Sequence, residues 1–352
     1  MLDTLRLVKL IQQQSRIQKT RYQEQKDTAR LLWEKIIKNT DLQQQLLQKN
    51  NFTFNLPLGT IYNANMFVNE YTVCGIDGSQ IYPDRHEGFS EYLINIGTAH
   101  FIYSSLSRAE LDTTPYVFSG FEDGAVVTAE LVNAQRTNYE LAHAVAVARH
   151  ESNPIIMFDG ALMFWHLQTP IMQELFLQNY LEYLRTLHKE NKKYLGYISA
   201  SHSCELVTLL EKAAQLMGIS ATFDHLVDTD IIEFFLKKNQ YTQVFKPTSD
   251  LSIMYPAQLR PCFIYLHVGS EIARIELPEY LTGDQDTIAH LVGLISDQVE
   301  KGNGYPVALS EAHEQAVVKA KDRDFFYAML QMHHQKKITT SLKLSKKRSA
   351  AL

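Results

Sequence analysis

Residues 73–79 read Val-Cys-Gly-Ile-Asp-Gly-Ser, and residues 155–162 read Ile-Ile-Met-Phe-Asp-Gly-Ala-Leu. Each stretch is a short apolar run that ends in Asp-Gly, which is typical of a buried strand bounded by a turn. Asp77 and Asp159 are therefore expected at the carboxyl ends of two strands, where the following glycine lets the backbone turn away. Two such strands side by side would bring both carboxylates to one sheet edge, an arrangement that can hold a divalent metal ion. A single Asp-Gly would be explained by a turn alone, and two copies leave both interpretations open.

The rest of the chain alternates strand-like and helix-like segments, which favours an α/β sheet. Ala- and Leu-rich or amphipathic stretches without internal Gly or Pro predict helices at 127–150, 172–187, 205–217 and 310–331. Apolar runs bounded by turn residues predict strands at 91–98, 100–104, 194–199, 261–268 and 271–277. Residues 1 to about 50 lack Gly and Pro and are rich in Gln, Lys, Arg and Leu, so they predict one or two long helices.

Composition limits the class of protein. The chain has 352 residues, is 45% hydrophobic and carries a net charge of −5, which argues against coating nucleic acid through bulk charge. No apolar run approaches the roughly 18 residues that a membrane helix needs, and no signal-peptide pattern precedes the first helix. The three cysteines are widely spaced and in no metal-binding pattern. We therefore expect reduced cysteines, a cytoplasmic protein and no membrane association.

The end of the chain differs from the rest, because no acidic residue follows Asp324. A solvated, frayed terminus explains such a tail, and an arm that contacts DNA phosphates is the functional alternative. Its basic residues are Lys336, Lys337, Lys343, Lys346, Lys347 and Arg348.

Further candidates for chemistry lie outside the two Asp-Gly phrases. Glu140 is on the helix that precedes the second phrase, and a helix crossing a sheet can place one carboxylate over the strand ends. Most helical glutamates face solvent, and other acids compete for the role. Tyr305 and His313 flank a Gly-Tyr-Pro turn and the helix after it, where a histidine can bind a metal or move a proton. The competing acids are Glu122, Asp123, Glu130 and Glu151. The chain has no Walker-type loop, no dinucleotide-binding glycine pattern and no nucleophile elbow.

Together these segments resemble the NurA family of DNA-end-processing nucleases. The matching pieces are short and occur in order over residues 70–320, and this order together with the eight-residue step from Tyr305 to His313 makes the set fairly specific. They are 75–80, 136–140, 158–162, 273–278, 304–306 and 312–313.

The resemblance implies a fold, an activity and a site. The fold would be a ribonuclease-H-like mixed sheet flanked by helices, with an N-terminal helical extension at 1–52, a nuclease domain at 60–332 and a basic tail at 333–352. The activity would be metal-dependent exo- and endonuclease cleavage in DNA end resection and double-strand-break repair. The protein would be a homodimer that works with a HerA-type hexameric helicase, an ATPase that feeds it DNA. Two divalent ions, manganese or alternatively magnesium, would be bound by Asp77, Glu140, Asp159 and His313, with Tyr305 beside them as a further catalytic residue.

The chain departs from the family pattern in two places. The family commonly has a lysine after the second Asp-Gly strand, where residues 197–203 contain none, so His202 is the substitute to consider. The second phrase also has Ala161 where serine is more usual. Three alternatives stay open at this point: a ribonuclease or resolvase-like nuclease on the same sheet, a non-catalytic dimeric DNA clamp or adaptor for a helicase, and a small-molecule phosphohydrolase.

Overall fold

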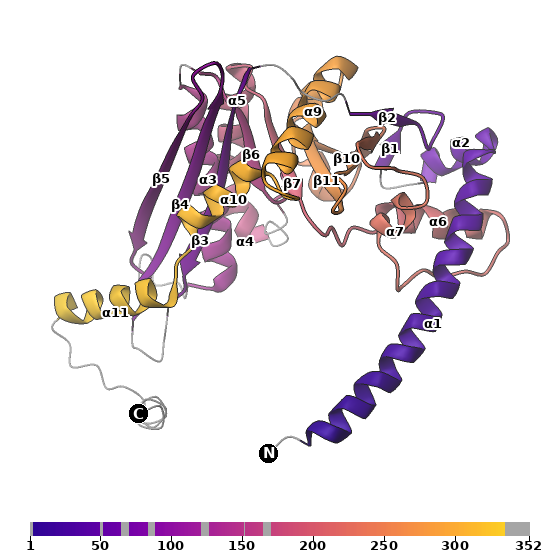
Figure 1. Cartoon of the computed structure of the whole chain (residues 1–352), viewed down its shortest axis with the longest axis horizontal. Helices are drawn as coiled ribbons and strands as arrows, with labels where there is room; N and C mark the ends of the chain where they lie inside the picture. The colour runs from indigo at the N-terminus through magenta and orange to yellow at the C-terminus, as the bar shows by residue number, and fades with distance from the viewer. Residues whose placement is uncertain are drawn as a thin grey trace. The chain divides into compact units, whose positions relative to one another are not determined.

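The structure is a computed structural model that describes residues 3–49, 52–64, 70–83, 89–120, 127–150, 152–164 and 170–334 (Figure 1). The chain divides into two compact units, each built from two separate segments of sequence. Unit 1 comprises Met1–Phe67 and Gly196–Val299, and unit 2 comprises Val68–Leu195 and Glu300–Leu352. The first boundary follows Phe67 and the second falls inside the strand β7 (Tyr194–Ile198).

The sheet of unit 2 begins as an antiparallel meander and ends with a parallel strand. In the meander, β3 (Tyr71–Ile81) pairs with β4 (Tyr92–Tyr103), and β4 pairs with β5 (Arg108–Phe118). The next strand, β6 (Ile155–Asp159), lies on the other side of β3 and runs parallel to it. The start of β7 follows β6, so the order is β5-β4-β3-β6-β7. Strand β6 is buried along its first four residues, which explains its continuous apolar sequence.

Two helices cover opposite faces of this sheet. A Cβ built on Gly75 would point at the backbone of α10 (Val307–Ala316), whereas one built on Gly78 would point at side chains of α3 (Ala129–Ala148). These glycines are three residues apart on β3, so they face opposite sides of the sheet. Helix α3 begins at its N-cap Thr128, whose hydroxyl accepts a hydrogen bond from the Leu131 N–H. The remaining helices of this unit are α4 (Pro170–Met172), α5 (Gln178–Lys189) and α11 (Ala320–His334).

The strands of unit 1 follow the order β1-β9-β10-β11-β7, with β8 pairing both β10 and β2. Aromatic side chains on these strands form the centre of its core, where Phe52, Phe245 and Phe263 contact one another. The strands are β1 (Phe52–Phe54), β2 (Ile61–Asn63), β8 (Gln240–Thr242), β9 (Phe245–Pro247), β10 (Pro261–His267) and β11 (Ile272–Pro278). The helices are α1 (Thr4–Ile37), α2 (Thr40–Lys49), α6 (Glu205–Leu216), α7 (Asp228–Ile232), α8 (Asp250–Ile253) and α9 (Gln285–Lys301).

The long helix α1 has two different halves. Toward its end Trp33 and Ile36 are buried in the core cluster, and Trp33 stacks on Phe235 with ring centroids 5.1 Å apart. Near its start Leu5 and Ile11 are exposed. The residues of α1 that are described as part of the hydrophobic core of unit 1 therefore lie in the second half of the helix.

A buried carboxylate caps helix α6 from outside the helix. The N-cap residue Cys204 makes no side-chain capping bond, and the fully buried Asp228 takes over that function. Asp228 accepts hydrogen bonds from the backbone N–H groups of Glu205, Leu206 and Val207 at 3.1, 2.8 and 3.1 Å. The hydroxyl of Tyr265 on β10 donates a fourth at 2.7 Å. One side chain therefore satisfies three of the N–H groups that a helix start leaves without partners.

The predicted α/β class, with a mixed sheet, flanking helices and an N-terminal helical extension, is confirmed. Three details differ from prediction. Strand β3 continues through Asp77-Gly78 as far as Ile81 and does not end there. The runs at 91–98 and 100–104 form one strand, β4, and the segment 310–331 is two helices because the chain turns extended at Val317. The domain boundaries stay a prediction, and the basic tail from 335 onward lies outside the described residues.

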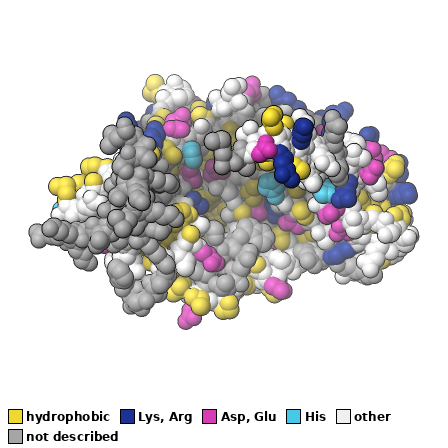
Figure 2. Space-filling view, turned by 90° about the horizontal axis from the view of Figure 1, so that it is seen from below, with side chains coloured by type: hydrophobic (Ala, Val, Ile, Leu, Met, Phe, Trp, Pro, Cys, Tyr) yellow, Lys and Arg dark blue, Asp and Glu magenta, His cyan; other side chains and the backbone are white. Residues whose placement is uncertain are grey.

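The surface agrees with the modest net charge. Figure 2 shows lysine and arginine as well as aspartate and glutamate side chains on the face that it presents. Within the part of the chain that the structure describes, no helix combines the length and the apolar character needed to cross a membrane.

Candidate active site

The parallel pairing of β3 and β6 brings the two Asp-Gly phrases together. The register pairs Val73 with Ile155 and ends with Ile76 beside Phe158, so that Asp77 and Asp159 are the next residues on neighbouring strands. Strand β6 ends at Asp159, and Gly160 leaves it with φ of +138°, a conformation that favours glycine. The two carboxylates therefore meet at one place in the sheet, as the sequence predicts.

Helix α10 brings His313 to the sheet because its backbone approaches the strands closely at two glycines. A Cβ on Gly75 of β3 would be 2.1 Å from the carbonyl oxygen of Ala308, and one on Gly97 of β4 would be 2.3 Å from that of Ala312. This close approach places the imidazole Nδ1 of His313 2.8 Å from Asp77 Oδ2.

Two further bonds hold Asp77 and helix α10 in place. The backbone N–H of Gly78 donates to the other Asp77 oxygen, Oδ1, at 2.8 Å. Beyond the aspartate, the Ser79 hydroxyl donates to the carbonyl of Ala316 at the end of α10. Asp77 is thus fixed through both of its oxygens, by the backbone on one side and by His313 on the other.

Glu140 reaches the site from α3, on the other face of the sheet. A Cβ on Gly78 would be 2.6 Å from Glu140 Oε1, so the absence of a side chain there makes room for the glutamate. Arg136, one helical turn earlier, lies with its Nε 3.4 Å from the same oxygen. Arg136 Nη1 also donates to the Gly78 carbonyl at 3.1 Å and to Gln80 Oε1 at 3.2 Å, which fixes the guanidinium on β3.

Tyr305 stands just before α10 and completes the group. Its hydroxyl hydrogen-bonds to Asp159 and lowers the pKa of that carboxyl against the larger effect of burial. The turn that carries it contains Asn303 and Gly304 at φ of +54° and +116°, which explains the Gly-rich sequence before the helix. Tyr305 and His313 therefore reach the two aspartates from one turn and one helix.

The electrostatics of the site show an excess of negative charge. Burial, opposed by Arg136 and reinforced by the carboxylates of Asp77 and Asp159, raises the pKa of Glu140 from 4.5 to about 7. Burial also raises the pKa of Asp159, with the Asp77 charge adding to it and His313 and Arg136 acting against it. Two buried carboxylates whose ionised forms are disfavoured, next to the carboxylate of Asp77, are a donor set that a cation would stabilise.

A cavity of about 170 Å³ lies beside the carboxylates of Glu140 and Asp159. Its other lining residues include Arg136, Phe158, Phe164 and Tyr180, so that one wall is charged and the other apolar. Sites that enclose a whole drug-sized molecule usually occupy about 300 Å³ or more. This cavity therefore suits part of a larger substrate better than a complete small molecule.

All five predicted residues thus lie in unit 2, and they interact. Of the competing acids, Glu130 is exposed in the first turn of α3, while Glu122, Asp123 and Glu151 lie outside the described residues. His202, the substitute for the missing lysine, is exposed in unit 1. Sequence reasoning missed the part played by Arg136, although its spacing of four residues from Glu140 puts both on one helix face.

The site thus combines acids on neighbouring parallel strands, helices on both faces of the sheet and a histidine from one of these helices, an arrangement that suits a nuclease. The family model described as the NurA domain matches residues 71–318. The chain therefore belongs to the NurA family. Comparison with curated proteins gave no match.

Among solved structures, the NurA nuclease from Sulfolobus solfataricus is similar, with a TM-score of 0.54, 14% sequence identity and coverage of 96% of this chain and 99% of that one. At this identity the likeness concerns the fold. Endonuclease V from Ciona intestinalis, in complex with a 23-mer DNA, aligns with a TM-score of 0.34, 11% identity and coverage of 83% and 98%. The catalytic domain of human endonuclease V aligns with a TM-score of 0.33 and 11% sequence identity, covering 74% of this chain and 85% of that one. Nothing further rests on these two matches.

Proposed function

We propose that the protein is a metal-dependent DNA nuclease whose active site is formed by Asp77, Glu140, Asp159, His313 and Tyr305. The observation that carries this proposal is the meeting of Asp77 and Asp159 on paired parallel strands, with His313 2.8 Å from Asp77. A phosphodiester is an anion that repels nucleophiles. A site for its hydrolysis therefore needs positive charge, a proton carrier and fixed geometry.

The donor set fits hard divalent cations such as manganese or magnesium. Asp77, Glu140 and Asp159 supply oxygen ligands, and His313 supplies a nitrogen. The raised pKa of Glu140 supports the fit, because burial and the neighbouring charges of Asp77 and Asp159 both disfavour its ionised form, which a bound cation would stabilise. Divalent cations, two in our proposal, would supply charge for the phosphate and acidify a water molecule.

The surrounding residues hold this arrangement and move protons. Arg136 is tied to Gly78 and Gln80, so it holds the Glu140 carboxylate toward the strand ends. Tyr305 orients Asp159 through its hydroxyl, and the exposed imidazole of His313 can exchange a proton with solvent or with a leaving oxygen.

Family membership supports the wider assignment. We propose that the protein acts in the cytoplasm on DNA ends, as an exo- and endonuclease in end resection and double-strand-break repair. We further propose that it works as a homodimer with a HerA-type hexameric helicase. A ribonuclease on the same fold remains the catalytic alternative, and it predicts a preference for RNA. The clamp or adaptor alternative is weaker because the three acids and the histidine proposed for catalysis are all present and His313 contacts Asp77.

A cleavage assay with the wild-type full chain tests this function. Linear single- and double-stranded DNA and an RNA of the same sequence would each be incubated with manganese, magnesium or EDTA. We expect DNA degradation with manganese or magnesium and none with EDTA. Equal or greater activity on RNA would contradict the choice of DNA. Absence of cleavage even with a helicase of the HerA type added would contradict the nuclease.

The electrostatic strain at Glu140 gives a second, independent prediction. Its pKa in the folded, metal-free protein is about 7, above the ordinary value, so the fold carries a cost once the pH is high enough to ionise it. Below about pH 4 Glu140 is protonated in both the folded and the unfolded protein, so its contribution to the free energy of unfolding is fully present. This contribution is lost as the pH rises through 7, where Glu140 ionises in the folded protein. We expect Glu140→Gln to stabilise the EDTA-treated protein by about 2 kcal/mol at pH 8 and to have little effect at pH 4.

Urea unfolding followed by circular dichroism at the two pH values measures this difference. Glu130→Gln is the matched control, because Glu130 lies exposed on the same helix. A stabilisation of equal size at both pH values would contradict the electrostatic origin.

A further inference from the structure

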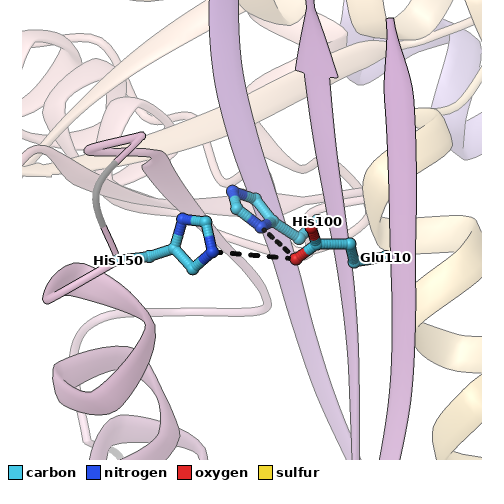
Figure 3. Close-up of side chains that lie close together, drawn as sticks. All are labelled: His100, Glu110 and His150. Atoms are coloured by element: carbon cyan, nitrogen blue, oxygen red, sulfur yellow. Dashed lines mark hydrogen bonds and ion pairs between the residues drawn. The ribbon is translucent and has the colours of Figure 1, made fainter.

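A second cluster of chemically active side chains lies away from the proposed active site. His100 on β4, Glu110 on β5 and His150 just after α3 converge on one another (Figure 3). His100 Nδ1 is 3.4 Å from Glu110 Oε2, and His150 Nε2 is 3.8 Å from the same oxygen. One nitrogen of each imidazole and one carboxylate oxygen therefore surround a common point.

The strand register explains why these residues meet. His100 pairs directly with Glu110 across β4 and β5, and with Cys74 across β3 and β4. His100 is three residues from Gly97, whose missing side chain faces α10, so His100 faces the opposite side of the sheet. The α3 side is where His150 is found, at the end of that helix. Gly97 pairs with Asp77, and His100 is three residues further along β4. His100 is therefore about 10 Å along the strand from the position of Asp77.

The outer nitrogens of both imidazoles contact the same hydroxyl. Ser152 Oγ lies 3.0 Å from His100 Nε2 and 2.9 Å from His150 Nδ1. A serine oxygen has two lone pairs, so it can accept an N–H from each ring. Metal-binding histidines usually donate their other N–H to such a partner, which fixes the ring and the tautomer. The contacts of Ser152 with both rings are an observation independent of the contacts among His100, Glu110 and His150.

The spacing suits a small transition-metal ion. Tetrahedral ligands at zinc–nitrogen distances of about 2.0–2.1 Å stand about 3.3 Å from one another. The carboxylate oxygen lies 3.4 and 3.8 Å from the two imidazole nitrogens, and all three ligand atoms lie within 4.8 Å of one another, so binding requires the half-exposed Glu110 and the His150 ring to move inward. Two neutral imidazoles and one carboxylate form a ligand set found in zinc sites.

Two features act against binding, and they limit the affinity without removing the site. Arg108 Nη2 lies 3.2 Å from Glu110 Oε1, so a positive charge stands next to the carboxylate, although it also holds the second oxygen toward the histidines. The Ser152 backbone N–H lies 3.3 Å from His150 Nδ1, so the metal-bound state requires that nitrogen to carry a proton and donate to the hydroxyl.

We propose that His100, Glu110 and His150 form a divalent transition-metal site, best suited to zinc, that is separate from the nuclease site and fastens the end of α3 to β4 and β5. The ligands are His100 Nδ1, His150 Nε2 and Glu110 Oε2, and the fourth position is open to solvent. The proposal does not depend on the nuclease function.

The test uses the full chain with Asp77→Asn and Asp159→Asn, which removes two of the proposed ligands at the other site. Zinc binding is measured by calorimetry, and cobalt is added in parallel because its visible spectrum reports tetrahedral ligation. His150→Gln and Glu110→Gln are compared with this parent. Both side chains are partly exposed, at 37% and 48%, so the substitutions should leave the fold intact. His333→Gln, an exposed histidine on α11, is the matched control.

We expect one zinc equivalent to bind to the parent and to the His333→Gln control, and to raise their melting temperatures. Affinity should fall at least about a hundredfold in His150→Gln and in Glu110→Gln, and the tetrahedral cobalt spectrum should disappear. The proposal is overturned if the parent binds no zinc. It is equally overturned if both substitutions leave affinity and spectrum unchanged, since the ion would then sit elsewhere.

Discussion

Replacing Asp77 with asparagine is expected to reduce metal-dependent DNA cleavage by about a thousandfold or more. Asparagine keeps the size of the side chain and its bond from the Gly78 N–H. It removes the negative charge that would hold the cation and the acceptor for His313, which lies 2.8 Å away. Asp159→Asn should have an effect of the same order, because Asp159 is the residue equivalent to Asp77 on the neighbouring parallel strand. Initial rates on labelled linear DNA with saturating manganese measure the loss.

The control is Asp112→Asn, an exposed aspartate on β5 of the same sheet. It should cleave at the wild-type rate, and all three variants should show wild-type circular dichroism and melting temperature within a few degrees. A protein with Asp77→Asn that still cleaves at the wild-type rate would remove Asp77 from the site. If Asp77→Asn loses both activity and structure, its result does not test the role of Asp77. The nuclease site is then tested by Asp159→Asn, because Asp159 is the last residue of its strand.

Replacing Asp228 with alanine should have the largest effect on stability, a loss of about 3 kcal/mol. The substitution removes the acceptor for three backbone N–H groups at the start of α6 and for the Tyr265 hydroxyl, all in a site with no exposure to water. Buried donors without partners carry the full cost of losing water. Urea unfolding of the wild type and the variant measures the difference in midpoint.

Asp224→Ala serves as the matched control in the same segment. Asp224 is exposed and accepts a hydrogen bond from Gln25 Nε2, so its removal should leave the unfolding midpoint close to that of the wild type. Nuclease activity at low temperature should survive in both variants, because Asp228 belongs to unit 1 and the proposed site to unit 2. Equal midpoints for Asp228→Ala and the wild type would show that Asp228 does not cap α6 as described.

The sequence predicts most of the fold because its signals are local. The apolar run before Asp159, the Ala-rich helix before it and the strands at 261–277 are each decided by neighbouring residues. Strand β5 was not predicted, because its surface is mostly exposed and Arg108–Phe118 lacks an apolar run. The continuation of β3 past Asp77 was also missed, since Asp-Gly is a turn signal that pairing with β4 overrides.

The site was predicted to a different extent for different residues. Asp77 and Asp159 follow from the repeated phrase, because paired parallel strands place equivalent residues of the two phrases side by side. Glu140 and His313 needed the family resemblance, because which face of a helix meets a sheet depends on packing between distant segments. The cluster at His100 was not predicted at all. Its partners are ten and fifty residues away and are brought together only by the β4–β5 register and the end of α3.

The close backbone approach between α10 and the strands constrains what Gly75 and Gly97 can become. A Cβ at these positions would lie 2.1 and 2.3 Å from carbonyl oxygens of the helix, so an alanine at either one would push α10 away from the sheet. His313 on α10 would then move away from Asp77, which now lies 2.8 Å from it, although no proposed ligand had been changed. Two glycines that carry no functional group thus set the position of a proposed metal ligand.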